Sequence, residues 1–280
     1  MAISINKLDE NIQNQIIEAY KNNMSLREIE KQFGATRATV SKFLEAKGIK
    51  TTKGNHYRKY FHDVDFFEII DTEEKAYWLG FMYADGYIIN NENHYGEDDF
   101  GLTLAEDSLD SIEKFKKSIN ATNPIRYDDS KGIGQRQVKI VCRSQKTVND
   151  LIDKGVLKNK SLILKPPTKV PQELIRHFIR GFFDGDGSLT RYQNKNCTHV
   201  AFGINFTTTY DMAKWLQNIF QTGNVFPEKR RKATWYFSLG GNQQVLKFCH
   251  YMYDNASIWM DRKYNRYKEL LEKYGENQGN

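Results

Sequence analysis

Two aspartates, Asp85 and Asp186, close two similar stretches of the chain. The segment Trp78-Leu-Gly-Phe-Met-Tyr-Ala-Asp-Gly86 recurs 101 positions later as Ile179-Arg-Gly-Phe-Phe-Asp-Gly-Asp-Gly187. If helices carrying these segments pack side by side, the two carboxylates emerge together, and their repulsion raises at least one pKa unless a cation intervenes. Magnesium prefers such oxygen ligands and also takes water and phosphate oxygens. The repeat therefore predicts a site where a metal-activated water attacks phosphorus.

A simpler interpretation is that Ala-Asp-Gly and Gly-Asp-Gly are ordinary turns, where aspartate and glycine are common for backbone reasons. Two observations favour the site. The motif occurs twice in matched context, and small residues lie four positions apart, Gly80 with Ala84 and Gly181 with Gly185. Residues at this spacing share one helix face, so they let two helix backbones approach closely.

The elements around each motif match in order. Asp71 and Glu74 can form a capping box before the first motif helix, and Pro171 suits a first helical turn before the second. Strands begin at Gly86 and Gly187. The periodicity further predicts strands at 100–105, 138–142, 200–207 and 234–239, and helices at 111–119, 147–153, 212–220 and 243–253. The chain is thus predicted to contain a duplicated unit of about a hundred residues.

The N-terminal part predicts a separate helical module. Ser25 with Glu28 is suited to cap one short helix, Gly34 to stop it, and Thr36 to cap the next. The stretch from Ser25 to Leu44 resembles the helix-turn-helix of resolvases and transposases, over about residues 8–49. The resemblance implies that Arg37, Ala38 and Thr39 face base edges in a major groove, that Lys42 lies near phosphate, and that Thr36 also contacts DNA. A structural three-helix unit or a protein-binding module remains the alternative.

The basic excess of the chain is local. Residues 1–60 hold 11 Lys/Arg against 6 Asp/Glu, which leaves 30 against 29 for the rest. The linker after the helical module includes Lys53 and Arg58 and can run along the DNA backbone or enter a minor groove, although a solvated linker is equally expected. Three widely spaced cysteines, Cys142, Cys197 and Cys249, fit reduced thiols and no zinc motif.

No apolar run is long enough for a membrane span, and no Walker lysine motif indicates a nucleotide cofactor. These features, with the reduced thiols, predict an intracellular protein in the cytoplasm or nucleoid of a bacterial or phage-infected cell. They predict neither a membrane partner nor ATP use.

The duplicated motif resembles those of LAGLIDADG homing endonucleases, over about residues 65–275. The resemblance implies an α+β fold of two tandem pseudo-symmetric αββαββα repeats with saddle-like antiparallel sheets, plus the N-terminal all-α helix-turn-helix domain. The expected divisions are a helix-turn-helix at 1–50, a basic linker at 51–64, and repeats at 65–170 and 171–280. One chain would supply both halves of the active site, as a monomer.

The family pattern carries over to specific residues. It implies metal binding, of Mg²⁺ or Mn²⁺, by Asp85 and Asp186, helped by the backbone carbonyls of Ala84 and Gly185. Basic residues assist near each active centre, and Lys139 and Lys232 are the candidates. The chain departs from the pattern at Tyr83 and at Arg180, a large polar residue that can point outward from a helix edge. Asp184 is expected to have a capping or pairing role rather than to bind metal.

The resemblance also implies DNA reading by the sheets. Arginine and glutamine suit purine edges, whereas lysine suits phosphate. The candidates in the two repeats are Arg126, Arg136, Gln137, Lys139, Arg191, Gln193, Lys195, Lys229, Arg230, Arg231 and Lys232. Trp215, Tyr236 and Trp259 are expected in the core.

The resulting hypothesis is a site-specific double-strand DNA endonuclease associated with intron mobility. It would bind a long asymmetric target and leave short 3′ overhangs. The alternatives are a DNA-binding regulator that does not cut and an RNA maturase that assists intron splicing. A transposase is disfavoured because no third acidic residue stands out.

Overall fold

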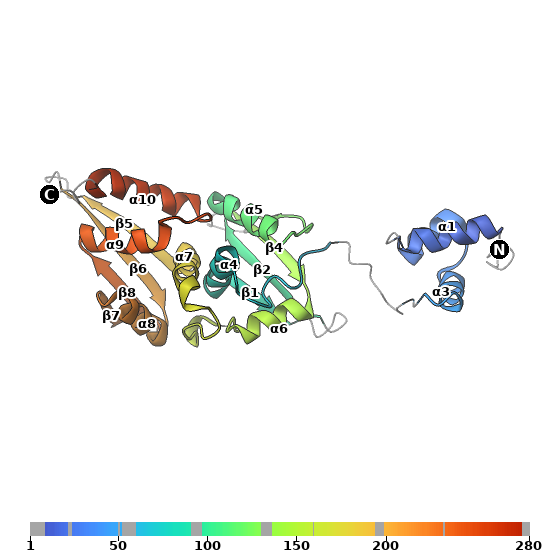
Figure 1. The fold of residues 1–280 in the computed structure, drawn as a ribbon, viewed down its shortest axis with the longest axis horizontal. Helices are drawn as coiled ribbons and strands as arrows, with labels where there is room; N and C mark the ends of the chain where they lie inside the picture. Colours follow the sequence, from blue (N-terminus) through green and yellow to red (C-terminus); the bar gives the residue numbers. More distant parts are fainter. Residues whose placement is uncertain are drawn as a thin grey trace. The chain divides into compact units, whose positions relative to one another are not determined.

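The structure is a computed structural model that describes residues 9–21, 24–49, 51, 60–90, 97–129, 136–158, 160–193, 199–231 and 233–275. It divides into two compact units, residues 1–60 and 61–280, which are described separately (Figure 1).

The first unit has three helices, α1 (Glu10–Lys21), α2 (Leu26–Phe33) and α3 (Arg37–Ala46). The predicted capping box at Ser25 and Glu28 is present, and Thr36 caps α3 by accepting the Thr39 amide. Gly34 has φ 73°, a left-handed conformation that favours glycine and ends α2 where the sequence indicates. Ile16, Ile29, Val40 and Leu44 are fully buried, so the unit has a small core of its own.

The second unit repeats one order of elements twice. The first copy contains α4 (Glu73–Ala84), β1 (Gly86–Ile89), β2 (Asp99–Ala105), α5 (Leu109–Ser118), β3 (Arg126–Asp128), β4 (Gln137–Arg143) and α6 (Gln145–Asp153). The second contains α7 (Ile175–Asp186), β5 (Gly187–Gln193), β6 (Val200–Thr208), α8 (Tyr210–Phe220), β7 (Asn224–Pro227), β8 (Trp235–Gly240) and α9 (Asn242–Tyr253), and α10 (Asp261–Tyr274) follows. This order confirms the αββαββα prediction.

Each copy forms a four-stranded antiparallel sheet, with strand orders β1-β2-β4-β3 and β5-β6-β8-β7. The motif helices α4 and α7 lie side by side between the two sheets (Figure 1). Alternate strand residues such as Leu102, Ile140, Phe206 and Phe237 are buried toward the helices. The opposite face of each sheet remains open to solvent at many positions, as expected for antiparallel sheets packed on one side.

The start of α4 differs from the sequence prediction. Its cap is Thr72, whose hydroxyl accepts the Lys75 amide, so the capping box expected at Asp71 and Glu74 is wrong by one position. Asp71 pairs with the Lys75 ammonium at 2.8 Å instead. Pro171 caps a short 3-10 turn, Gln172–Leu174, immediately before α7.

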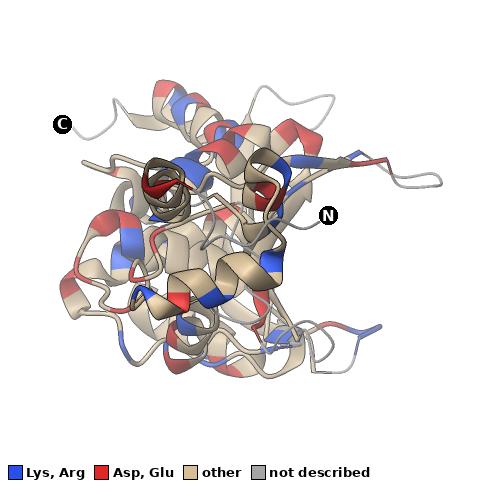
Figure 2. Cartoon of the chain, turned by 90° about the vertical axis from the view of Figure 1, so that its right-hand side faces the viewer, with Lys and Arg blue, Asp and Glu red and all other residues tan. Residues whose placement is uncertain are grey.

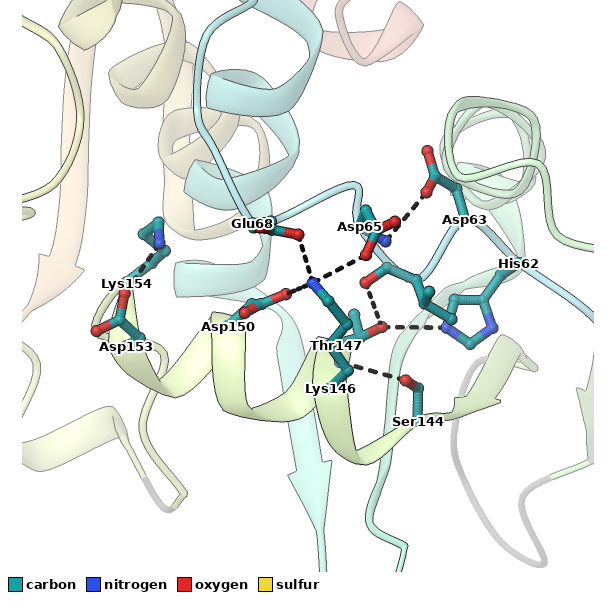
Figure 3. A network of polar contacts seen from close by, with 11 residues as sticks. His62, Asp63, Asp65, Glu68, Ser144, Lys146, Thr147, Asp150, Asp153 and Lys154 are labelled. Carbon is teal, nitrogen blue, oxygen red and sulfur yellow. Dashed lines mark hydrogen bonds and ion pairs between the residues drawn. The ribbon is translucent and has the colours of Figure 1, made fainter.

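The segment that enters the second unit is held by α6. The Lys146 ammonium pairs with Asp65, Glu68 and Asp150 within 3.0 Å, and Thr147 donates to the Val64 carbonyl (Figure 3). These contacts fix residues 62–68 against the first repeat. Within the described ranges, no helix has the length and apolar character that a membrane crossing requires.

Candidate active site

The two motif helices touch through their main chains. A Cβ atom built on Gly80 would lie 2.0 Å from the Phe178 carbonyl oxygen, and one built on Gly181 would lie 1.8 Å from that of Tyr77. Both distances are impossible for a real side chain. Glycine is therefore required at both positions by the close approach of α4 and α7.

This approach brings the ends of the helices together. A Cβ on Gly185 would meet the Ala84 methyl at 2.1 Å and Asp85 Oδ2 at 3.2 Å. Asp85 follows the last residue of α4 and Asp186 is the last residue of α7, so both carboxylates project from the same end of the helix pair. The two repeated aspartates therefore lie together at this end, as the sequence predicts.

The paired carboxylates are electrostatically unfavourable in the metal-free protein. Desolvation raises the pKa of Asp85, against the lowering effect of Lys263, Lys160 and Arg262. Desolvation and then repulsion by Asp85 raise the pKa of Asp186 to about 7. One side of the Asp186 side chain is exposed to solvent, and protein atoms pack around its other sides. The carboxylate is therefore only partly desolvated. The pair gains stability from any bound cation.

Two buried lysines complete the site, and both were missed in the sequence. Lys160 donates to the Gly86 carbonyl, and Lys263 donates to the Gly187 carbonyl at 2.5 Å. Each therefore contacts the glycine that follows an aspartate. Burial lowers the pKa of each ammonium to about 8, while the aspartates act in the opposite direction. The segments at Leu157 and Ile258 resemble each other in sequence, and this was the signal that could have found both lysines.

Arg180 points inward, so the expectation that it lies outward at a helix edge is wrong. Its guanidinium is fully buried and bonds to Glu73 at 2.7 Å, to the carbonyls of Met252 and Ile258, and to His177. The interior accepts this charge because each donor group has a partner. The arginine ties α4 to the segment between α9 and α10.

Asp184 has the pairing role expected for it. Its buried carboxylate accepts hydrogen bonds from the Tyr77 and Tyr253 hydroxyls, at 2.8 and 3.1 Å, and from the Met260 amide at 2.8 Å. It lies in the interior between α4, α9 and the segment before α10, away from the position of Asp186 at the helix end.

The sheets permit residue-by-residue matching of the two repeats. Gly86 pairs with Leu102 and Leu102 with Ile140, just as Gly187 pairs with Phe206 and Phe206 with Phe237. One position nearer the aspartates, Lys139 pairs with Thr103 in the first sheet and Tyr236 pairs with Thr207 in the second.

Lys139 and Tyr236 are therefore equivalent in position, and each is bonded to an acid. The Lys139 ammonium lies 2.7 Å from Asp128, and the Tyr236 hydroxyl donates to Glu228. The expectation that Tyr236 belongs to the core is wrong, because it lies on the open face of the sheet. Lys232, the other lysine expected to assist, lies outside the described residues.

Known proteins share the fold of the second unit. No family model matches the sequence, and no curated protein matches it. The structure of the LAGLIDADG homing endonuclease I-GzeII with its DNA target is similar at a TM-score of 0.51 and 12% identity, over 70% of this chain and 88% of that one. I-LtrWI, a LAGLIDADG homing endonuclease bound to target DNA, is similar at 0.51 and 12%, over 76% and 90%. The second unit has the LAGLIDADG homing-endonuclease fold.

The open face of the first LAGLIDADG sheet is rich in paired charges. Lys139 pairs with Asp128, and four residues further along β4 Arg143 pairs with Asp99 at 2.7 Å; Arg126 lies next to Lys139 in the register. Arg136 is two residues before the buried Val138, on the other side of the sheet, where it pairs with Asp129 and Glu106 and lies over the Tyr127 ring. Along the described elements, Lys and Arg are interspersed with Asp and Glu (Figure 2). A polyanion would have to displace these acids.

The second LAGLIDADG sheet has a different open face. Arg191 pairs with Phe202 in the register, so Arg191 and Gln193 lie on the side opposite to Thr190 and Tyr192. Arg191 donates to Gln193 at 2.7 Å. The open face instead presents hydroxyl and amide groups, at Ser188, Thr190, Asn205, Tyr236 and Ser238.

A basic turn adjoins this second sheet. Lys229, Arg230 and Arg231 are exposed between β7 and β8. The two arginines line an open depression of about 330 Å³ together with Thr207 and Tyr236. Thr207 follows Phe206, the partner of Gly187, so the depression opens at the end of the sheet that carries Asp186.

In the first unit, the predicted reading residues lie along one helix. Arg37 and Lys42 are exposed on α3, opposite the buried Val40 and Leu44. Thr36 and Thr39 are half-buried because they form the cap of the helix. Lys53, Arg58 and Lys195, which were also expected to contact DNA, and Cys197 lie outside the described residues.

The residues at the helix ends fit a divalent cation. Two carboxylates and the nearby carbonyl groups of Ala84 and Gly185 are hard oxygen donors of the kind that Mg²⁺ takes. Within the described part of the chain, no three His, Cys, Asp or Glu side chains lie close enough to hold an ion. The protein would therefore supply only part of the coordination shell.

Proposed function

We propose that this chain is a metal-dependent, site-specific endonuclease that cuts both strands of DNA. The observation that carries the proposal is the pairing of Asp85 and Asp186 at one end of two helices in main-chain contact, between two sheets with open faces. The LAGLIDADG fold supports it, since I-GzeII and I-LtrWI are homing endonucleases bound to DNA targets.

Different residues would take part in metal binding and in contact with the DNA backbone. Asp85 and Asp186, with the carbonyls of Ala84 and Gly185, would hold Mg²⁺ or Mn²⁺, which supplies an activated water and neutralises charge at phosphorus. Hydrolysis would join a water oxygen to phosphorus and break one bridging P–O bond, while the water would lose a proton and the departing oxygen would take one up. Lys139 and the turn that contains Arg230 and Arg231 would contact the DNA backbone near the two cuts. The two cuts would leave short 3′ overhangs.

DNA recognition would use both units of one chain. The two open sheet faces differ in chemistry, which favours an asymmetric target. In the first unit, Arg37 and Lys42 would extend the bound site, with Arg37 near base edges in the major groove and Lys42 near phosphate. A monomer would suffice, because both carboxylates belong to one chain.

Cleavage by purified protein provides the direct test. A duplex is first selected for binding from a randomised library in the presence of chelator, and Mg²⁺ is then added. We expect double-strand cuts that chelator abolishes and that fall about a thousandfold, or ~4 kcal/mol in the barrier, in Asp85→Asn and in Asp186→Asn. Both variants should still bind the duplex.

Other results would redirect the proposal. Unchanged cutting by both variants would contradict the assigned roles of the aspartates. Specific binding without any cutting in Mg²⁺ or Mn²⁺ would favour a regulator that retains the scaffold.

A second experiment addresses the first unit. We expect the double variant Arg37→Ala with Lys42→Ala to weaken binding at least tenfold, since it removes two exposed cations from α3 without touching its core. Affinity for the selected duplex is measured by fluorescence anisotropy at fixed salt. Arg27→Ala on α2 is the matched control, and equal effects of the two changes would remove α3 from the interface.

A further inference from the structure

A row of partnered residues crosses the open face of the second sheet, from the active site to the edge. Thr207 follows the partner of Gly187, which places it opposite Asp186 in the register. Thr207, Tyr236 and Phe226 are then successive partners on β6, β8 and β7. Neighbouring strands are about 4.8 Å apart, so three steps place Phe226 roughly 14 Å from Asp186. Phe226 therefore lies on the face proposed to bind DNA.

Phe226 is an apolar side chain at an exposed edge. It is 44% exposed on the edge strand β7, where charged residues usually prevent association with other chains. Its ring packs against the Tyr236 ring, with 5.4 Å between the centroids. The Tyr236 hydroxyl donates to Glu228, whose other carboxylate oxygen accepts the Arg230 amide at 3.1 Å. The two rings are thus held in place before any ligand binds.

One feature of DNA matches an exposed phenyl ring. The C5-methyl group of thymine is the apolar group that base pairs present in the major groove, beside hydrogen-bond donors and acceptors. A polar base edge held against Phe226 would lose hydrogen bonds with water that the ring cannot replace. Arg230 and Arg231 line the depression beside Tyr236, where they suit the neighbouring phosphates. The surroundings of Phe226 therefore favour thymine.

The equivalent position in the first sheet is Arg126. Thr103, Lys139 and Arg126 are successive partners on β2, β4 and β3, in the same order outward from Asp85. Lys139 pairs with Asp128, whereas the exposed Arg126 side chain makes no hydrogen bond or ion pair with the described part of the chain. An arginine in this state suits the O6 and N7 acceptors of guanine, its commonest base contact.

We propose that Phe226 reads the methyl group of a thymine in the major groove, and that Arg126 reads a guanine at the equivalent position of the other half-site. This inference rests on the proposed endonuclease function and names two bases of its target. Base pairs are stacked about 3.4 Å apart, so a reach of roughly 14 Å places each base within about five base pairs of the nearer cut.

The thymine contact is tested with the full-length protein and the duplex selected from the randomised library, in chelator at fixed salt. Each thymine near a cut is replaced singly by deoxyuridine, which lacks only the methyl group. We expect one replacement to weaken binding about fourfold, the effect of one buried methyl group, by fluorescence anisotropy. In Phe226→Ala the same replacement should change affinity less than about twofold, because the contact is already lost.

Two further variants separate the base contact from folding. Phe226→Leu keeps an apolar side chain at the edge strand and should still bind the thymine duplex more tightly than the deoxyuridine duplex. Ile152→Ala removes a partly exposed apolar side chain from α6 and should keep the full fourfold loss, to within about twofold. Both should melt near the wild-type temperature, because neither side chain belongs to the core.

The guanine contact is tested in the same way. Replacing a guanine by 7-deazaguanine removes the N7 acceptor and leaves base pairing intact. We expect one such replacement to weaken binding about fivefold or more in the wild type, and less than about twofold in Arg126→Ala. Lys117→Ala, which removes an exposed cation from α5, should respond as the wild type does. Equal losses in the wild type and Arg126→Ala would contradict this contact.

The outcomes distinguish this inference from the proposed function. If the wild type cuts the duplex but deoxyuridine has the same effect in the wild type and in Phe226→Ala at every position, the thymine contact is wrong and the endonuclease remains. A selected target with no thymine within about five base pairs of either cut would also contradict it. If no duplex is selected and none is cut, both fail.

Discussion

The Asp186 carboxyl carries the largest electrostatic cost among single residues of the site. Partial desolvation and the neighbouring Asp85 raise its pKa from 3.8 to about 7. A folded-state pKa above the unfolded value means that the native protein binds the proton more tightly. Stability therefore falls as pH rises between about 4 and 7, and the full cost is present above pH 7.

Removing this charge should stabilise the metal-free protein. We expect Asp186→Asn to raise the free energy of unfolding above pH 7 by about 1 kcal/mol, well below the ~4 kcal/mol of a three-unit shift, because solvent access screens the charge. The difference should vanish below pH 4. Urea unfolding at pH 4 and pH 8 in chelator measures it. A variant less stable than the wild type at pH 8 would contradict the unfavourable pairing.

Among the residues of the site, those that belong to the repeated motif could be predicted from the sequence. Asp85 and Asp186 could be found because each closes the same nine-residue motif. Lys160 and Lys263 were missed because each reaches the site from a segment about 75 residues after its aspartate, and the resemblance between their two segments indicates only that they are equivalent, not that they lie at the aspartates. Contacts of that range depend on packing, which no local pattern encodes.

Among the contacts between elements, the contact between α4 and α7 tolerates substitution least. We expect Gly181→Ala to destabilise the protein by about 3 kcal/mol or more, since the new methyl would lie 1.8 Å from the Tyr77 carbonyl oxygen and force the helices apart. Thermal unfolding with a paired cleavage assay measures both consequences. Gly240→Ala is the control, because no atom lies within 4 Å of its added methyl. Equal melting temperatures would show that the helices can separate.

Element boundaries were predictable where capping residues mark them. Ser25, Glu28 and Thr36 cap helices as the sequence indicates, because each cap is made by neighbours in the chain. The cap of α4 was misplaced by one residue because Asp71 and Thr72 both suit it; Thr72 is the cap, and Asp71 pairs with Lys75 instead. The edge strands β3 and β7 were not located, since they are short and mostly exposed.

At the scale of the whole molecule, the two halves of the site are unequal. Lys139 with Asp128 occupies in the first repeat the place of Tyr236 with Glu228 in the second. An ammonium stabilises developing negative charge better than a phenol does. The two DNA strands should therefore be cut at different rates, with a nicked intermediate.

Strand-specific labelling of the selected duplex tests this inequality. We expect Lys139→Met to slow the faster strand at least tenfold, whereas Tyr236→Phe should slow the other strand less than about threefold, because the phenol contributes less. Tyr236→Lys should bring the two rates closer together. Equal rates in the wild type, with equal losses in both variants, would contradict the assignment.

The main-chain contact at Gly80 and Gly181 also bears on how such a molecule can evolve. Because the helices meet backbone to backbone, the place of the two carboxylates does not depend on the open-face side chains of either sheet. Substitutions on the open sheet faces can then accumulate in one repeat without disturbing the other or the centre. The fold thereby separates the part that must stay fixed from the parts that are free to acquire a new target.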